Sequence, residues 1–236
     1  MEDEKIICID RTYDFRQSDI YSEIFVLDDS FYNYEYTHKF PNTTILDIPE
    51  KFQKDLKVFN RFDVEWNNNY QQIVVCLIVR NKNNFMFLDC LSGDMSSNIT
   101  MIEGHVKYNE NHNDMMMNTV LYENMIREFN EEVVINFSKV NKKDIGAFNN
   151  FKLKYVAWNN STSTSISYRH IGFIYELDLS NTKYPISKTI FQSGEPDVNK
   201  LHFVDITKIK PNDYNYFDSW TREILVYNQY LLNHKQ

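Results

Sequence analysis

The feature that most constrains the fold is the run QQIVVCLIVR at residues 71–80, in which β-branched and other apolar side chains dominate. Such a run favours a β-strand. NKNN at 81–84 is typical of a turn, and FMFLDC at 85–90 is again apolar. The two runs therefore predict a β-hairpin, and with it a sheet.

Shorter runs add further elements to this sheet. Strands are expected at residues 5–10, 23–29, 43–48, 96–104, 152–158, 165–179 and 200–206. Residues 118–133 and 213–232 have the apolar spacing of helices, the Asn-rich residues 107–118 suggest a loop, and the polar residues 50–62 suggest a helix or a loop. The pattern predicts a mixed sheet between helices, an α+β fold arranged as an α/β/α sandwich.

Length and charge narrow the possible functions. A chain of 236 residues suits one globular domain, or one domain with an extension. The formal net charge of −8 and the pI of about 5.3 argue against a large nucleic-acid-binding surface. An acidic protein of this kind would need metal ions to bind an anionic substrate.

Cysteine usage and hydropathy predict a cytoplasmic protein. Cys8, Cys76 and Cys90 are widely spaced and have no metal-binding spacing, as expected of reduced thiols. The N-terminal MEDEKIICID is acidic and lacks the apolar run of a signal peptide. No stretch approaches the ~20 apolar residues of a membrane span, so no membrane partner is expected.

The predicted helix at 118–133 carries three glutamates within five positions, in ENMIREFNEEVVI. At about 100° per residue, one apolar stripe comprises Tyr122, Ile126, Phe129 and Val133. Glu128, Glu131 and Glu132 fall within an arc of about 100° away from that stripe. Arg127 precedes Glu131 by four positions and can neutralise and orient it. Glu128 and Glu132 then share one face with no cation of their own in the sequence.

Spacing alone leaves two interpretations of this acidic face open. Like charges four residues apart cost only about 0.2–0.5 kcal/mol per pair, so a solvated helix surface tolerates them. The other interpretation is a carboxylate cage for Mg²⁺ or Mn²⁺, because these hard cations are held by a few carboxylates together with substrate phosphates.

The surrounding motif favours the cage. REFNEEVVI at 127–135 resembles the REUXEEXGU half of the Nudix box, where U is a bulky apolar residue. GHVKYNE at 104–110 has the GX5E spacing of the other half and follows ITMIE. The flanking FDVEWNNNYQQIVVCLIVRN and SYRHIGFIYEL look like strands of a Nudix-like phosphoesterase group. The resemblance implies a Nudix domain at 61–236, with residues 1–60 as an N-terminal extension packed on the same domain.

Three positions depart from the family pattern. Glu103 replaces the first glycine of a GG pair, which is harmless where this position gives only a main-chain oxygen. Sixteen residues, 111–126, separate Glu110 from the arginine where the pattern has seven, so Thr119 holds the usual place of the glutamate. Val134 replaces a glycine, and a β-branched residue adopts the left-handed conformation at a cost. The helix is therefore expected to end differently.

The resemblance implies a role for each matching residue. The metal carboxylates are Glu128, Glu131 and Glu132, oriented by Arg127, and Glu103 offers a main-chain oxygen. The candidate cofactor-binding residues are Gly104, His105 and Glu110. Glu195, in the loop QSGEPD at 192–197, is the candidate base or further ligand, with Asp197 second. His105 and Glu195 also fit ordinary surface positions.

The leading hypothesis is a metal-dependent Nudix-type pyrophosphohydrolase that uses Mg²⁺ or Mn²⁺. In such enzymes water attacks a phosphorus of a nucleoside diphosphate linked to another group X. The expected partner is a small nucleotide-type substrate, with no nucleic acid, and a homodimer is compatible with the family. The alternatives are a Nudix-fold ligand-binding or regulatory module without catalysis, and an unrelated α+β domain with an acidic helix face.

Overall fold

The long apolar run forms strand β4 (Tyr70–Asn81), and β5 (Asn84–Cys90) returns beside it. The two strands are antiparallel, with Val79 opposite Met86. Lys82, in the turn, has a φ of 55°, the left-handed conformation that tight hairpin turns use. The predicted hairpin is confirmed.

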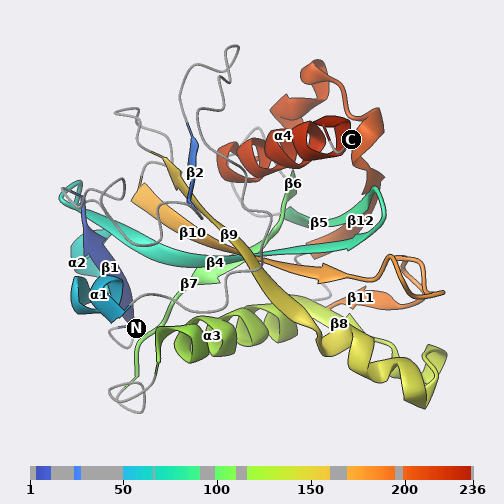
Figure 1. The fold of residues 1–236 in the computed structure, drawn as a ribbon, viewed down its shortest axis with the longest axis horizontal. Coiled ribbons are helices and arrows are strands. Elements are labelled where there is room, and N and C mark those ends of the chain that lie inside the picture. The colour runs from blue at the N-terminus through green and yellow to red at the C-terminus, as the bar shows by residue number, and fades with distance from the viewer. Residues whose placement is uncertain are drawn as a thin grey trace. The chain divides into compact units, whose positions relative to one another are not determined.

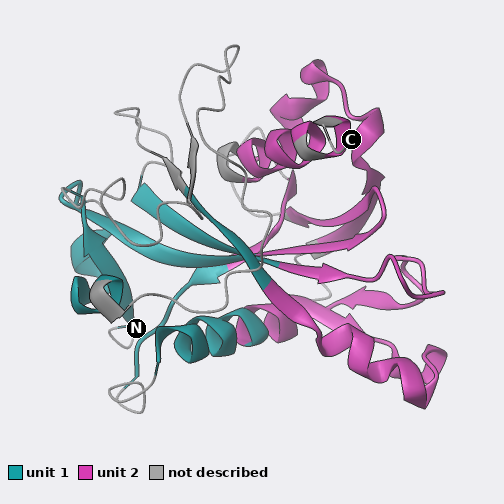
Figure 2. Cartoon of the chain, in the orientation of Figure 1, with its two compact units in different colours: residues 1–76, 104–126, 153–175 teal, residues 77–103, 127–152, 176–236 magenta. Residues whose placement is uncertain are grey.

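The computed structural model describes residues 4–11, 24–27, 50–65, 67–90, 99–109, 116–159, 169–194 and 199–234. The predicted strand at 43–48 and the candidates Glu110, Glu195 and Asp197 lie outside these residues. The chain divides into two compact units (Figure 2). Unit 1 comprises residues 1–76, 104–126 and 153–175, and unit 2 comprises residues 77–103, 127–152 and 176–236.

The remaining elements are labelled in Figure 1 as far as room allows. Unit 1 contains β1 (Lys5–Asp10), β2 (Ile24–Leu27), α1 (Glu50–Lys54), β3 (Leu56–Asn60) and α2 (Arg61–Val64). Unit 2 contains β6 (Ile99–Thr100), β8 (Val133–Ile135), β11 (Phe191–Ser193), β12 (Asn199–Asp205) and α4 (Ser219–His234). The described residues of this unit also form the 3₁₀ helices η4 (Phe137–Lys139), η5 (Lys142–Asn149), η7 (Ile206–Lys208) and η8 (Pro211–Tyr216). Residues of both units form β4, β7 (Ile102–His105), α3 (Met117–Glu132), β9 (Phe151–Asn159) and β10 (His170–Asp178).

In unit 1 the strand order is β3-β1-β4-β10-β9-β2. β1 is antiparallel to β3 and to β4, where Cys8 lies opposite Gln72, and β2 is parallel to β9. Cys8 is buried with Ile6 and Val64. Because desolvation raises the pKa of the Cys8 thiol to about 12, this side chain packs as a protonated apolar group.

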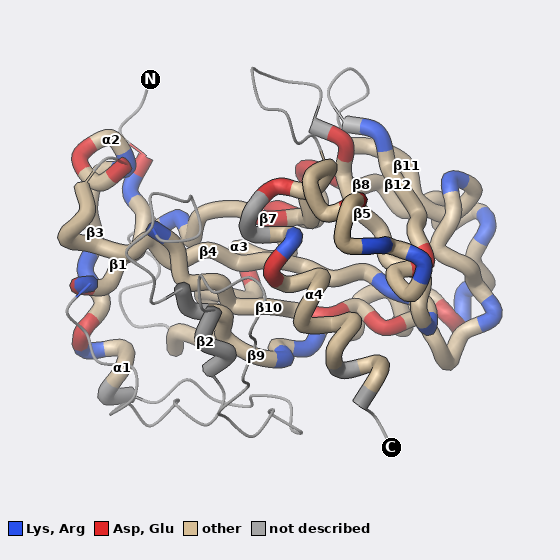
Figure 3. The backbone as a smooth tube through the Cα atoms, turned by 90° about the horizontal axis from the view of Figure 1, so that it is seen from above, with Lys and Arg blue, Asp and Glu red and all other residues tan. Residues whose placement is uncertain are grey.

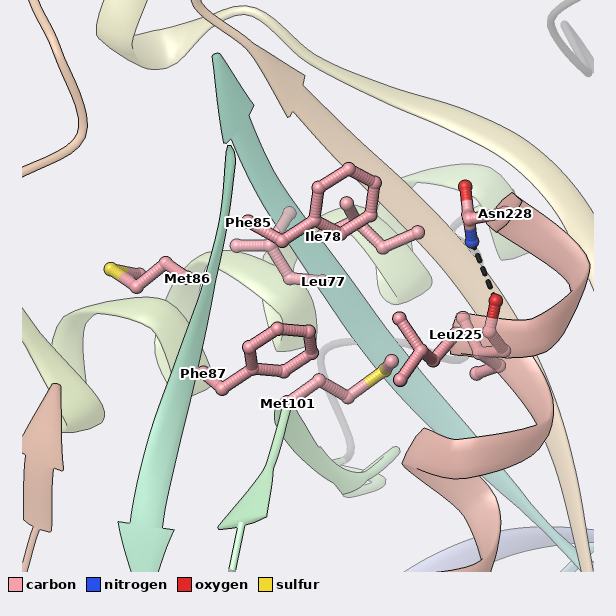
Figure 4. Close-up of a pocket in the computed structure, with 9 residues that line it drawn as sticks. Leu77, Ile78, Phe85, Met86, Phe87, Met101, Leu225 and Asn228 are labelled. Carbon is pink, nitrogen blue, oxygen red and sulfur yellow. Dashed lines mark hydrogen bonds between the residues drawn. The ribbon is translucent and has the colours of Figure 1, made fainter. Parts of the chain in front are cut away.

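In unit 2 the strand order is β12-β5-β4-β10, with β6 also paired to β5. β12 is antiparallel to β5, and β8 and β11 form a separate two-stranded sheet in which Val133 lies opposite Ser193. Under α4, Phe87, Met101 and Leu225 line a small apolar cavity (Figure 4). Apolar burial therefore holds α4 within this unit.

Helix α3 forms where the spacing predicts it, yet it buries a different face. Its buried apolar residues include Val120, Leu121, Met125 and Phe129. Tyr122, expected in the core stripe, is 37% exposed, whereas Glu128, expected on the solvated face, is only 8% exposed. The predicted stripe is confirmed at Phe129 and Val133 and wrong at Tyr122. Val120, Leu121 and Met125 shift the buried face of the helix away from Tyr122.

Two other elements differ from expectation. Residues 50–62 form a helix, a strand and the start of a second helix, α1, β3 and α2, rather than one helix or loop. The last helix begins at Ser219 instead of near residue 213, because Pro211 opens the separate 3₁₀ helix η8. Proline is well suited to a first helical position.

The chain thus has an α+β fold with a mixed sheet and helices, as predicted. The proposed boundary between an extension at 1–60 and a domain at 61–236 stays a prediction. Within the described residues, no helix combines the length and the hydropathy that crossing a membrane requires.

Candidate active site

The last turn of α3, in unit 2, carries a network of opposite charges. Arg127 Nη1 donates a hydrogen bond of 2.9 Å to Glu131 Oε2, and Arg127 Nη2 donates another to Glu128 Oε1. The expected pairing of Arg127 with Glu131 is therefore present. The expectation that Glu128 lacks a cation is wrong, because the guanidinium reaches its immediate neighbour as well. Planar, forked Arg is suited to holding two carboxylates at once.

These two carboxylates differ in their surroundings. The Glu128 side chain is 11% exposed, whereas the Glu131 side chain is 50% exposed. A buried carboxylate needs a hydrogen-bonded partner, and Arg127 supplies one that fixes the orientation of Glu128. The exposed oxygens of Glu131 remain within reach of solvent and of a ligand.

The end of α3 concentrates negative charge. Glu131 and Glu132 occupy its last two positions. The nearest basic residue before them in the helix is Arg127. The C-terminus of a helix carries a partial negative charge, so acidic residues there cost about 0.3–1 kcal/mol each. The arrangement opposes helix stability and favours a cation.

Glu103, on β7, lies in the electrostatic range of further acids in unit 2. The pKa of its carboxyl is raised well above the ordinary value by desolvation, then by repulsion from Asp218 and, more weakly, from Glu128. A 3.5 Å hydrogen bond from the Thr100 hydroxyl to Glu103 Oε1 opposes this rise in pKa. The surface of Glu103 is nevertheless exposed, so water screens part of the repulsion. Acidic positions of β7 and α3 can be followed in red in Figure 3.

Asp218 is a site residue that the sequence did not indicate. It precedes α4, and its Oδ1 accepts a hydrogen bond of 2.9 Å from the Thr221 backbone N–H, as an N-cap does. The Asp218 N–H donates to the Ile99 carbonyl at 3.0 Å, which ties it to β6. The sequence DSWT could have indicated a helix start, but not the neighbourhood of Glu103.

The other candidates of the GX5E half lie in unit 1. His105 packs edge-on against His170, with ring centroids 5.3 Å apart. Desolvation lowers the pKa of His105 to about 3, with smaller contributions from His170 and Arg61, so the imidazole is neutral. Gly104 is half-buried in β7. Within this unit, His105 is thus a neutral ring packed against His170, and its assignment to cofactor binding stays a prediction.

Hydrogen bonds from the Asn124 side chain to the backbone hold the segment after His105. The Asn124 side chain, which is 4% exposed, accepts a 2.9 Å hydrogen bond from the Lys107 N–H and donates one of 3.2 Å to the Lys107 carbonyl. A third bond, of 2.9 Å, runs from Asn124 Nδ2 to the Val120 carbonyl. Asn124 thus binds the segment to α3 as a neighbouring strand would.

The residue types of the acidic cluster in unit 2 fit a hard divalent cation. Carboxylate and main-chain oxygens are the ligands that Mg²⁺ and Mn²⁺ prefer. In the described part of the chain, no three His, Cys, Asp or Glu residues are close enough together to hold a metal ion. Side chains of the cluster would therefore have to turn toward a cation on binding.

Comparison with known proteins identifies the fold. No protein-family model matches the sequence, and no curated protein matches it. Among solved structures, Tm1382, a candidate Nudix hydrolase, aligns with a TM-score of 0.58 at 14% identity over 97% of this chain and 99% of that one. This likeness shows that the chain has the Nudix fold.

Two further structures are similar over about two thirds of the chain. One is a bifunctional NMN adenylyltransferase/ADP ribose pyrophosphatase from Francisella tularensis, in complex with AMP and a manganese ion. Its TM-score is 0.45 at 13% identity, over 69% of this chain and 41% of that one. The other is a hydrolase of the NUDIX family from Clostridium perfringens, with a TM-score of 0.34 at 15% identity, over 69% of this chain and 98% of that one.

Proposed function

We propose that this chain is a metal-dependent Nudix-type pyrophosphohydrolase. The observation that carries the proposal is the last turn of α3, where Arg127 holds Glu128 and Glu131. Glu103 lies within electrostatic range of Glu128 in this turn and of Asp218 in the same unit. The Nudix fold supports it, and the motif REFNEE lies at the end of α3.

The carboxylates of Glu128, Glu131 and Glu132, with the main-chain oxygen of Glu103, would hold Mg²⁺ or Mn²⁺. The ion would supply positive charge to neutralise a diphosphate and the attacking oxygen. Arg127 bonds to Glu128 and Glu131 and holds them on the last turn of α3, from which their oxygens would turn toward the ion.

The reaction is hydrolysis of a diphosphate bridge in a small nucleotide-type substrate. A water oxygen bonds to one phosphorus, the bond from that phosphorus to the bridging oxygen breaks, and one water proton passes to a carboxylate. Glu195 is the sequence candidate for this base. Glu103 is a described alternative, because its carboxylate lies within electrostatic range of Glu128.

A substrate panel tests the proposal. The protein with Mg²⁺ is incubated with nucleotide sugars, dinucleotides and nucleoside triphosphates, and the release of mononucleotide is measured. We expect turnover of at least one class, and its loss in Glu132→Gln. Absence of turnover on every compound, with Glu132→Gln indistinguishable from the parent, would defeat the proposal.

A second candidate function is a Nudix-fold module that binds its ligand without hydrolysing it. The absence of a ready group of three metal-binding side chains within the described residues favours this reading. The replacement of two box glycines by Glu103 and Val134 favours it as well. Calorimetric titration of Mg²⁺ and nucleotides separates the two functions, because a module of this kind binds them with no product formed.

A further inference from the structure

The end of α3 is completed by a residue from a distant part of the sequence. The last four carbonyls of a helix have no partner within it. In many helices a glycine just beyond the end helps to satisfy them. Here α3 continues directly into β8 with Val133 and Val134. The Gly194 N–H instead donates a 2.8 Å hydrogen bond to the Glu132 carbonyl.

Gly194 approaches this helix end more closely than any other residue type could. A Cβ atom at position 194 would lie 2.2 Å from the Glu131 carbonyl oxygen and 3.0 Å from the Glu132 carbonyl carbon. Both obstacles are backbone atoms, so no side-chain rotation relieves the clash. Glycine is used where two backbones must come this close.

The pairing of β8 with β11 makes this contact continuous with a small sheet. Val133 lies opposite Ser193, and Ile135 lies opposite Phe191. Gly194 follows Ser193 directly, so it meets α3 at the residue where the helix changes into the strand. The glycine expected after REUXEE in the sequence is thus replaced by one across a strand pair.

We propose that Gly194 is a positioning residue that fixes the last turn of α3, and through it the orientation of Glu131 and Glu132 toward a divalent cation. The inference rests on the proposed function, because it assigns these carboxylates to the metal site. Both carboxylates stand on the two residues whose backbone Gly194 touches. Adding a methyl group must move the helix end or the residue 194 backbone by about 1 Å, and a misplacement of that size can cost about 10²-fold in activity.

The test compares two glycine substitutions in the full chain. Gly194→Ala adds the clashing Cβ, whereas Gly146→Ala adds a Cβ that meets nothing within 4 Å, in η5 of the same unit. Calorimetry measures the affinity of each variant for Mn²⁺, and circular dichroism measures its melting temperature. We expect Gly194→Ala to bind Mn²⁺ at least about ten-fold more weakly, and Gly146→Ala to stay within about two-fold of the parent.

Each outcome decides between the two claims. Unchanged Mn²⁺ affinity in a folded Gly194→Ala protein, with or without a lower melting temperature, overturns the positioning role alone. Binding by the parent without turnover of any substrate overturns only the proposed hydrolase activity. Absence of Mn²⁺ binding by the parent overturns both.

A second measurement applies if Gly194→Ala does not fold. Amide hydrogen exchange of the parent is followed by NMR with and without Mg²⁺. Because coupling between sites is reciprocal, Mg²⁺ should slow exchange at the Gly194 amide. The control is the Asn136 amide, which donates a 2.8 Å bond to the Ile190 carbonyl. Equal exchange at Gly194 in both conditions contradicts the proposal.

Discussion

The two parts of helix α3 use polar residues in opposite ways. In the part that belongs to unit 1, Asn124 is buried and its hydrogen bonds end on backbone groups of Lys107 and Val120. In the last turn, which belongs to unit 2, Glu128 and Glu131 depend on one arginine, and two acids stand at the negative end of the helix. The first arrangement stabilises the fold, whereas the second costs stability.

This difference teaches where to look for function in a divergent chain. Paired neutral groups such as Asn124 are explained by the fold alone. Clustered like charges that oppose the helix dipole have no such explanation, and residues that lower stability are commonly retained for activity. Substitutions in the last turn should therefore lower activity and spare stability, and substitutions in the first part should do the reverse.

The largest expected effect is that of Glu132→Gln on turnover. Losing a charged metal ligand should lower kcat more than about 100-fold. The melting temperature should stay equal or rise, since removing a charge from the helix end recovers about 0.3–1 kcal/mol. Steady-state kinetics and thermal unfolding measure the two quantities. Asp55→Asn, at an exposed position of unit 1, is the control. A large loss of stability in Glu132→Gln would contradict the distinction between the two parts of α3.

Arg127→Lys should have the next largest effect. Lysine keeps the positive charge but cannot hold Glu128 and Glu131 in the forked geometry. We expect activity to fall about 10–100-fold, the range for residues that orient metal ligands. The Mn²⁺ affinity should fall in parallel, as measured by calorimetry. Parent-like activity in Arg127→Lys would mean that a positive charge at position 127 suffices for activity, whether or not it orients Glu128 and Glu131.

Asn124→Ala tests the first part of the helix. It removes three hydrogen bonds, two to the part-buried backbone groups of Lys107 and one to the buried Val120 carbonyl. We expect a loss of about 2–4 kcal/mol in the free energy of unfolding, measured with urea. Thr119→Ala, at an exposed position of the same helix, should change it by less than about 0.5 kcal/mol. Similar values for both variants would contradict the structural role of Asn124.

The smallest expected effect is a pH dependence caused by His105. Its pKa is lowered from 6.5 to about 3 in the folded protein, so the unfolded chain binds more protons between these values. The contribution of His105 to stability is complete above pH 6.5 and is lost as the pH falls below it. Between pH 6.5 and 4.5 the parent should lose about 1–2 kcal/mol more than His105→Asn, measured by urea unfolding. Parallel curves would show that the imidazole is not kept neutral.

The strand pattern was predictable wherever apolar residues dominate. The run at 71–80 forms β4, and the hairpin with β5 follows from NKNN. Leu56–Asn60 was missed because β3 is paired only to β1 and keeps two exposed residues, so it lacks the apolar signal of a buried strand. The strands β8 and β11 were missed because each has only three residues.

The site was predictable in its residue types but not in its contacts. The motif indicated Arg127 and the three glutamates, and their roles as metal ligands stay predictions. Helix angles did not reveal that Glu128 is buried, because burial depends on the residues that pack against the helix. Asp218 lies 115 positions from Glu103 in the sequence, and Gly194 lies about 60 positions from the end of α3. No local pattern encodes either proximity.

The most direct test of the central claim is a calorimetric titration of Mn²⁺ into the parent protein, Glu128→Gln and Asp55→Asn under identical conditions. If the last turn of α3 is a cation site, the parent and Asp55→Asn bind equally, and Glu128→Gln binds at least about ten-fold more weakly. Equal affinity in all three proteins, or no binding by the parent, would contradict the account.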